Sequence, residues 1–237
     1  MENNKFKKGV VDGLPICFGY LAVSFAFGIS AVQGGLSWLE ALLISATNLT
    51  SAGQLAGIGV IIGGGSLIEM AVTQLVINSR YSLMSVSLSQ KLSEKIPLLH
   101  RFLIAFGNTD EIFAVSVSQK GMVGKKYMYG LILTPYIGWT LGTLLGAVLG
   151  NILPEIVISS LGVAIYGMFI AIVVPVVKKE KATLLCVLGA ILLSCIFKYL
   201  PILQFIPSGF VIIICAVIPS LIFAFAAPIK VEEEVEC

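Results

Sequence analysis

The amino-acid sequence predicts an all-α integral membrane protein, a bundle of seven or eight transmembrane helices in a single transmembrane domain covering residues 1–237. Three observations predict this class. Of the 237 residues, 57% are hydrophobic and 12% are charged, which is about half the charged fraction of an ordinary soluble domain. Apolar runs recur along the chain, each long enough to cross a hydrocarbon core of about 30 Å. Glycine, proline and charged residues separate these runs.

Eight helical segments follow from the order of the runs and breaks. We expect helices over residues 10–32, 37–62, 66–90, 98–119, 128–150, 156–177, 182–200 and 208–227. The breaks are rich in glycine at 34–35 and 63–66 and in charge at 121–126 and 178–181. Those at 91–97, 151–154 and 201–207 contain proline. Pro15 and Pro135 have similar places in the first and fifth runs, which suggests an internal repeat of the kind found in transporters.

The second run is the one most expected to be broken. Its middle reads Asn48-Leu49-Thr50-Ser51-Ala52-Gly53-Gln54, a polar patch of small residues between hydrophobic flanks. Close helix packing is one interpretation, because small residues favour it in membranes. The other is an unwound or re-entrant segment whose backbone lines a cavity.

Lysine and arginine clusters indicate the orientation of the helices. A cytoplasmic N-terminus puts several clusters, and the C-terminus, on the cytoplasmic side: Lys120, Lys125 and Lys126, then Lys178, Lys179 and Lys181, and finally Lys230. The loop region that carries Lys91, Lys95 and Arg101 disagrees, since eight crossings would place it outside. One re-entrant segment, leaving seven crossings, would explain the disagreement.

Three charged residues lie near the middle of apolar runs, where a bilayer makes charge costly. Arg80 is eleven residues from both Glu69 and Lys91, or about 16 Å from each end of its helix. Asp110 and Glu111 are equally central in the next run. Charges at such depth mark substrate, ion or proton pathways. We therefore expect these charges to share one depth on adjacent helices, and Glu69 to reach the membrane interface.

Polar side chains recur around Arg80 at helical spacing, and they are Gln74, Asn78, Tyr81, Ser82, Ser85 and Ser89. Asp110 and Glu111 are about 100° apart around a helix, so only one can pair well with Arg80. Two interpretations remain open. The pair could only hold two helices in register, or one acid could pair while the other meets a substrate, an ion or a proton.

Several short motifs occur in a characteristic order: Gly13-Leu14-Pro15 with Phe18-Gly19, Phe27-Gly28, Ser51-Ala52-Gly53-Gln54, Asn78-Ser79-Arg80-Tyr81, Thr109-Asp110-Glu111, and Gly167-Met168-Phe169 with Pro175. In these motifs and their spacing the chain resembles the AzlC-type branched-chain amino acid permeases. The resemblance implies export of valine, leucine, isoleucine or methionine across a bacterial cytoplasmic membrane. It also implies a small companion subunit, the AzlD-type membrane protein.

The leading hypothesis is a secondary transporter that exports neutral amino acids, driven by the proton-motive force. The candidate pathway residues are Ser51, Gly53, Gln54, Asn78, Arg80, Thr109, Asp110 and Glu111. Arg80 or a helix N-terminus near Ser51 would bind the substrate carboxylate. Asp110 or Glu111 would bind its ammonium group or carry a coupling proton.

Other classes have less support in the sequence. No Walker motif predicts nucleotide binding, and a single histidine excludes a His-Glu-x-x-His protease. We expect no enzymatic activity, no metal or other cofactor, and no nucleic-acid partner. The alternatives kept are a non-transporting scaffold subunit and a transporter of another small solute.

Overall fold

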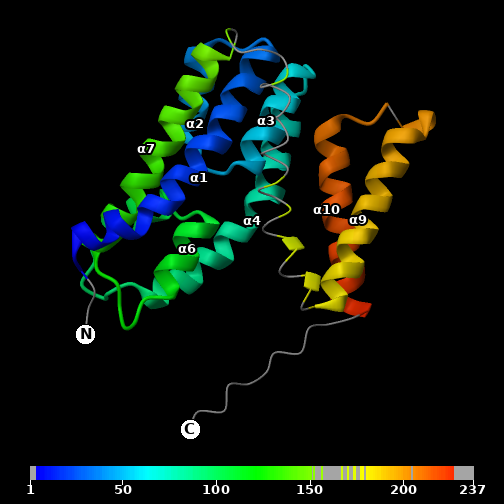
Figure 1. Ribbon diagram of the computed structural model, residues 1–237. Helices are drawn as coiled ribbons and strands as arrows, with labels where there is room; N and C mark the ends of the chain where they lie inside the picture. The colour runs from blue at the N-terminus through cyan, green and yellow to red at the C-terminus, as the bar shows by residue number, and fades with distance from the viewer. Residues whose placement is uncertain are drawn as a thin grey trace. The chain divides into compact units, whose positions relative to one another are not determined.

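The computed structural model describes residues 4–150, 152, 156, 167, 170, 173–174, 177–178, 180–203 and 205–226, and Figure 1 shows their helices. The chain forms two compact units. The first contains Met1–Ile58 with Gln74–Tyr166, and the second contains Gly59–Thr73 with Gly167–Cys237. The predicted segment 156–177 lies almost entirely outside the described residues.

The described helices follow most of the predicted runs. They are α1 (Phe6–Gln33), α2 (Trp38–Thr47), α3 (Ala52–Ile62), α4 (Leu67–Lys91), α5 (Leu98–Phe106), α6 (Asp110–Val117), α7 (Lys125–Leu149), α9 (Lys181–Tyr199) and α10 (Ser208–Ala226), with a short 3-10 turn at Pro201–Leu203. Within the described parts of the chain, α1, α7, α9 and α10 are long and apolar enough to cross a membrane. The protein is thus an all-helical membrane protein. α4 is also long enough, at 25 residues and about 37 Å, but it is more polar.

α1 and α7 run parallel along a seam of glycines. A Cβ built on Gly130 would lie 2.8 Å from the Val10 nitrogen, and one on Gly138 would lie 2.6 Å from the Cys17 carbonyl oxygen. One on Gly146 would lie 2.7 Å from the Phe25 carbonyl carbon. Such contacts are too close for any side chain, so these glycines let the two backbones meet, as small residues do between membrane helices. The matching order of contacts shows that both helices begin at the same end.

The predicted helix 37–62 is wrong, because the chain folds back there into a hairpin of α2 and α3. Gln54 donates a hydrogen bond to Ser45 across 3.0 Å, whereas residues nine apart in one helix are about 13.5 Å apart. Ala41 and Ile58, from the outer ends of the hairpin, share one core cluster with Ala31 of α1. The broken-segment interpretation of the polar patch is therefore confirmed, and residues 48–51 form the tip.

The predicted helix 98–119 is wrong for the same reason, since α5 and α6 form a second hairpin. His100 hydrogen-bonds Tyr129, and Ser116 Oγ lies 3.4 Å from the sulfur of Met128. In a continuous helix residues 100 and 116 would be about 24 Å apart. Instead they contact neighbouring residues of α7. The break at 107–109 begins with Gly107, which packs on the side chain of Ile132.

The two hairpins enter from opposite ends of α1 and α7. The α2–α3 hairpin packs on Ala31 and Ala147, near the C-terminal ends of these helices, and the α5–α6 hairpin packs on Tyr127 and Met128 near the N-terminal end of α7. Their tips meet midway, at Tyr136, which donates a hydrogen bond of 3.0 Å to the Ala46 carbonyl of one hairpin. The ring of Phe106, from the other hairpin, lies 6.1 Å from the Tyr136 ring.

The second hairpin explains the loop that disagreed with the predicted orientation. The Val123 amide donates to the Lys91 carbonyl at 3.0 Å, and the Ser93 amide donates to the Val123 carbonyl at 2.9 Å. The loop before α5 thus lies beside the loop before α7. Its lysines share one end of the unit with Lys125, because 98–119 enters and returns without crossing. Which side of the membrane this end faces stays a prediction, as does the internal repeat.

Candidate functional site

A cavity of about 210 Å³ lies between the two hairpin tips. Its lining residues come from both breaks and from α4: Thr47, Asn48, Leu49, Thr50, Tyr81, Ala105, Phe106, Asn108 and Thr109. At roughly 30 Å³ per water molecule, its volume equals that of about seven waters, which is the scale of a small solute. Irregular backbone within a membrane is tolerated where it lines a cavity, and the two hairpin tips lie at such a cavity wall.

Two oxygen atoms at this cavity have no hydrogen-bond partner among the described residues. They are Thr50 Oγ1 from the first tip and Asn108 Oδ1 from the second, and both are buried. The Asn108 side chain, 4% exposed, uses its amide nitrogen on Ser85 of α4. Buried polar atoms are rarely left unpaired, so these two acceptors indicate a site for a ligand with N–H or O–H donors.

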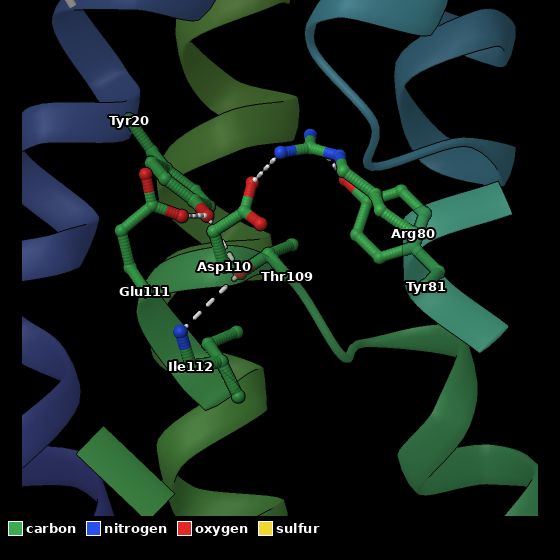
Figure 2. Close-up of polar contacts among 7 residues, drawn as sticks. All are labelled: Tyr20, Arg80, Tyr81, Thr109, Asp110, Glu111 and Ile112. Atoms are coloured by element: carbon green, nitrogen blue, oxygen red, sulfur yellow. Dashed lines mark hydrogen bonds and ion pairs between the residues drawn. The ribbon is translucent and has the colours of Figure 1, made fainter. Parts of the chain in front are cut away.

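Arg80 and Asp110 form an ion pair beside this cavity, as Figure 2 shows. The Arg80 Nη1 atom lies 2.6 Å from Asp110 Oδ2, and the two side chains are 39% and 30% exposed. Arg80 also donates a hydrogen bond of 3.3 Å to the hydroxyl of Tyr81, a residue of the cavity wall. The prediction that Arg80 lies beside an acid of the next run is confirmed, and their depth in the membrane stays a prediction. Asp110, however, begins the half-helix α6 instead of standing in the middle of a span.

Glu111 points away from Arg80 and contacts α1 (Figure 2). Its Oε2 accepts a hydrogen bond from the Tyr20 hydroxyl, which also lies 2.7 Å from Thr109 Oγ1. A phenol carries one proton, so the Thr109 hydroxyl supplies the proton of that second bond. Asp110 and Glu111 therefore have different partners, as their separation around the helix predicted. Asp110 pairs with the arginine and Glu111 with the tyrosine.

The first turn of α6 favours both acids. Thr109 is its N-cap and accepts a hydrogen bond from the amide of Ile112. Asp110 and Glu111 occupy the first turn, where the partial positive charge of a helix N-terminus stabilises carboxylates. The break before α6 thus places two negative groups at the middle of the unit, where Arg80 can reach one of them.

The polar stripe of α4 connects the two tips. Gln74 donates a hydrogen bond of 2.7 Å to the carbonyl of Gly53, and Asn78 donates one of 3.0 Å to Gln74. A Cβ on Gly53 would lie 2.7 Å from the Gln74 oxygen, so a side chain there would displace the end of Gln74. Further along α4, Ser85 contacts Asn108 at 3.4 Å. These contacts fix α4, and with it Arg80, against both hairpins.

Two other predicted site residues, Gln54 and Ser51, have structural roles in the first hairpin. Gln54 is 1% exposed, and its amide donates to Ser45, whose hydroxyl lies 2.6 Å from that of Thr143 on α7. It ties the first hairpin to α7 and does not line the cavity. Ser51 has a positive φ of 41°, a backbone conformation that non-glycine residues seldom adopt. It makes the sharp turn into α3.

Tyr20 and Tyr136, near the middles of α1 and α7, were not predicted as site residues. Each reaches a hairpin tip through its hydroxyl. Neither belongs to a polar stripe, so no local pattern identifies them. The second break had a local signal, because Gly107 precedes Thr109-Asp110-Glu111 and a threonine followed by acidic residues is typical of a helix N-terminus.

Comparison with known proteins shows which sequences this chain is similar to. A family profile described as "AzlC protein" matches residues 15–153, the part that contains both hairpins and the ion pair. An uncharacterized membrane protein of Archaeoglobus fulgidus is 34% identical over 191 residues, 80% of this chain and 84% of the relative. The inner membrane protein YgaZ of Escherichia coli is 29% identical over 193 residues, 78% of each chain. No solved structure matches.

Proposed function

Because the chain belongs to the AzlC family of membrane proteins, we propose that it is a secondary transporter that exports branched-chain or similar small neutral amino acids. The observation that carries this proposal is the cavity between the hairpin tips. It combines unpaired acceptors, Thr50 Oγ1 and Asn108 Oδ1, with a neighbouring arginine and apolar walls. Broken helices that meet near the membrane midplane are a recurring way to build a substrate site in transporters.

Each part of a neutral amino acid has a matching group at this site. The carboxylate would bind Arg80, whose guanidinium presents donors in a fork that matches carboxylate geometry. The ammonium group would donate to Thr50 Oγ1 and Asn108 Oδ1. The aliphatic side chain would lie against Leu49 and Phe106 of the cavity wall.

Asp110 makes substrate binding a competition between two carboxylates for Arg80. Its Oδ2 lies 2.6 Å from Arg80 Nη1, so a substrate carboxylate must compete with it for the same guanidinium. Once displaced, Asp110 would have no cationic partner, and an unpaired carboxylate in an apolar region is costly. The site would thus favour ligands that carry a carboxylate of their own. Glu111, held by Tyr20, would keep its hydrogen bond throughout.

The remaining parts of the proposal concern the assembly and its membrane. A small AzlD-type membrane subunit would be the partner, and the protein would be a multi-pass component of the bacterial cytoplasmic membrane with both termini in the cytoplasm. The basic residues near the start of α1, Lys5, Lys7 and Lys8, and those at the start of α7 share one end of the unit. This arrangement supports a cytoplasmic N-terminus, since basic residues collect on that side.

Transport by the purified protein with its companion, reconstituted into proteoliposomes, tests this proposal. Labelled leucine and valine should move in response to a pH gradient. Arg80→Ala should abolish the movement and Arg80→Lys should restore only part of it, because lysine lacks the planar fork. Glu40→Gln is the matched control, since Glu40 is an exposed acid in the capping box of α2.

The alternatives give different results in the same assay. A scaffold subunit would give the same flux with and without Arg80, and would leave the flux to its companion. A transporter of another solute would move no neutral amino acid but would respond to Arg80→Ala when the right solute is tested. Leucine flux that survives Arg80→Ala unchanged would refute the assigned site.

A further inference from the structure

Glu69 is a buried acid in the second compact unit, and the expectation that it reaches the membrane interface is wrong. It is the third residue of α4, in the helix's first turn, and only 3% of it is exposed. Its own amide donates to Ser66 Oγ at 3.1 Å, which caps the helix and fixes the start of α4. The side chain is therefore buried inside the unit and does not extend into water.

The carboxylate of Glu69 has one hydrogen-bond donor among the described residues. Its Oε1 accepts from the amide of Gly209, at the start of α10, across 2.8 Å. The ion pairs of the described residues do not include Glu69. Thr73, one helical turn further along α4, is fully buried, and its hydroxyl oxygen has no described partner.

Two glycines keep the space beside the carboxylate clear of side chains. A Cβ on Gly209 would lie 2.7 Å from Glu69 Oε1 and 2.5 Å from Thr73 Oγ1, and a Cβ on Gly65 would lie 2.6 Å from Glu69 Oε2. Glu69 also lines a cavity of about 350 Å³, together with Val60, Gly63, Gly64, Gly65, Ser66, Pro207 and Phe210. The carboxylate thus lies against two backbones that carry no side chain, at the wall of a cavity large enough for a small ligand.

The charge of Glu69 is only partly balanced by its surroundings. The N-termini of α4 and α10 each contribute a partial positive charge of about half a unit, which falls off within one turn. Among the residues that the structure describes, no lysine, arginine or histidine lines this cavity. A buried carboxylate without a cationic partner either takes up a proton or holds a cation.

We propose that Glu69 is the binding site for a monovalent cation, a proton or a sodium ion, with the Thr73 hydroxyl as a second oxygen ligand. The cavity that Glu69 lines gives the ion access to the carboxylate. This inference rests on the second unit alone, and it does not depend on which solute the first unit moves. Its failure would leave the amino acid site of Arg80 untouched.

Labelling with dicyclohexylcarbodiimide, an apolar reagent, tests the site in the purified full chain. The acid transfers its proton to a carbodiimide nitrogen, and its oxygen bonds to the central carbon. The adduct then rearranges to a stable N-acylurea without loss of any atom. Peptide mass spectrometry locates the modified residue, so labelling at Asp110 or Glu111 is distinguished from labelling at Glu69. Glu69→Gln keeps an oxygen for the Gly209 amide and should lose only this label.

We expect labelling of Glu69 that decreases as the pH rises. If sodium is the ion, added sodium at constant pH and ionic strength, balanced with choline, will slow the reaction. If the proton is the ion, sodium will have no effect while the pH dependence persists. An exposed control, Glu40, should show no sodium effect. Labelling that is independent of both pH and sodium, or absent at every pH, would overturn the proposal and leave Glu69 as a cap for α10.

Discussion

Replacing Asp110 by asparagine should make the protein bind leucine more tightly, although it removes a charged residue from the site. Asparagine keeps the size of the side chain and one oxygen acceptor, but it no longer competes as an anion for Arg80. If the substrate carboxylate must displace Asp110 from the guanidinium, weakening that competitor favours the substrate. The predicted direction is opposite to the loss expected from damaging a binding residue.

The size of the expected gain in leucine affinity depends on how exposed the Arg80–Asp110 ion pair is. Two unit charges 4 Å apart interact by about 4 kcal/mol at an effective dielectric constant of about 20. The Arg80 and Asp110 side chains are 39% and 30% exposed, and pairs of that kind contribute only about 0.2–1 kcal/mol after screening and loss of side-chain entropy. Taking about 1 kcal/mol, the dissociation constant should fall about fivefold.

Isothermal titration calorimetry of the purified protein with its companion measures this change. Asp110→Asn should bind leucine about fivefold more tightly than the unchanged protein, and Arg80→Ala should lose binding. The double variant should show no gain over Arg80→Ala, because the gain depends on the freed guanidinium. Equal or weaker binding by Asp110→Asn would refute the competition between Asp110 and substrate.

Three further changes test the supporting structure. Gly28→Ala should lower the free energy of unfolding by about 1–3 kcal/mol, because the new Cβ would press on the backbone of α7. Gly19→Ala is the control and should be tolerated, because a Cβ there would meet no atom within 4 Å. Equal thermal midpoints of the two variants in detergent would argue against the glycine seam between α1 and α7. Ser51→Gly should relieve roughly 1 kcal/mol of backbone strain and so raise the thermal midpoint, and Ser51→Val should lower it. The reverse order would show that the turn is unstrained. Tyr20→Phe should slow transport, because it removes the hydrogen bond from the Tyr20 hydroxyl to the Glu111 carboxylate, and such a bond contributes about 1–3 kcal/mol. An unchanged rate would show that this bond is dispensable.

The depth of the charged residues could be predicted from the sequence because it depends only on helix rise. Arg80 is equally far from both ends of a continuous helix, and α4 is such a helix. The two hairpins could not be identified as surely, because two half-helices have the same apolar length as one crossing. Lys91 and Lys95 gave the better clue, because eight crossings would place these basic residues outside. A segment that returns to the side from which it entered does not cross the membrane, so the loops after it lie on the opposite side from the one that a full crossing predicts.

Tertiary partners were beyond the reach of hydropathy and spacing. Glu69 was expected at the interface because it lies near a helix end, yet Gly209, distant in sequence, covers it with a backbone amide. Tyr20 looks like any aromatic residue of an apolar run, and its role follows only from its contact with Glu111. In both cases the contact joins segments whose packing no local pattern records.

Protection of a cysteine in the cavity wall by leucine tests the central claim most directly. The five native cysteines would be replaced, and Phe106→Cys would place one thiol in the cavity. Phe102→Cys, on the same helix but outside the cavity lining, is the matched control. Leucine should slow alkylation of the thiol at 106 and leave that at 102 unchanged. Equal alkylation at 106 with and without leucine, in protein that still binds leucine, would contradict a substrate site between the hairpin tips.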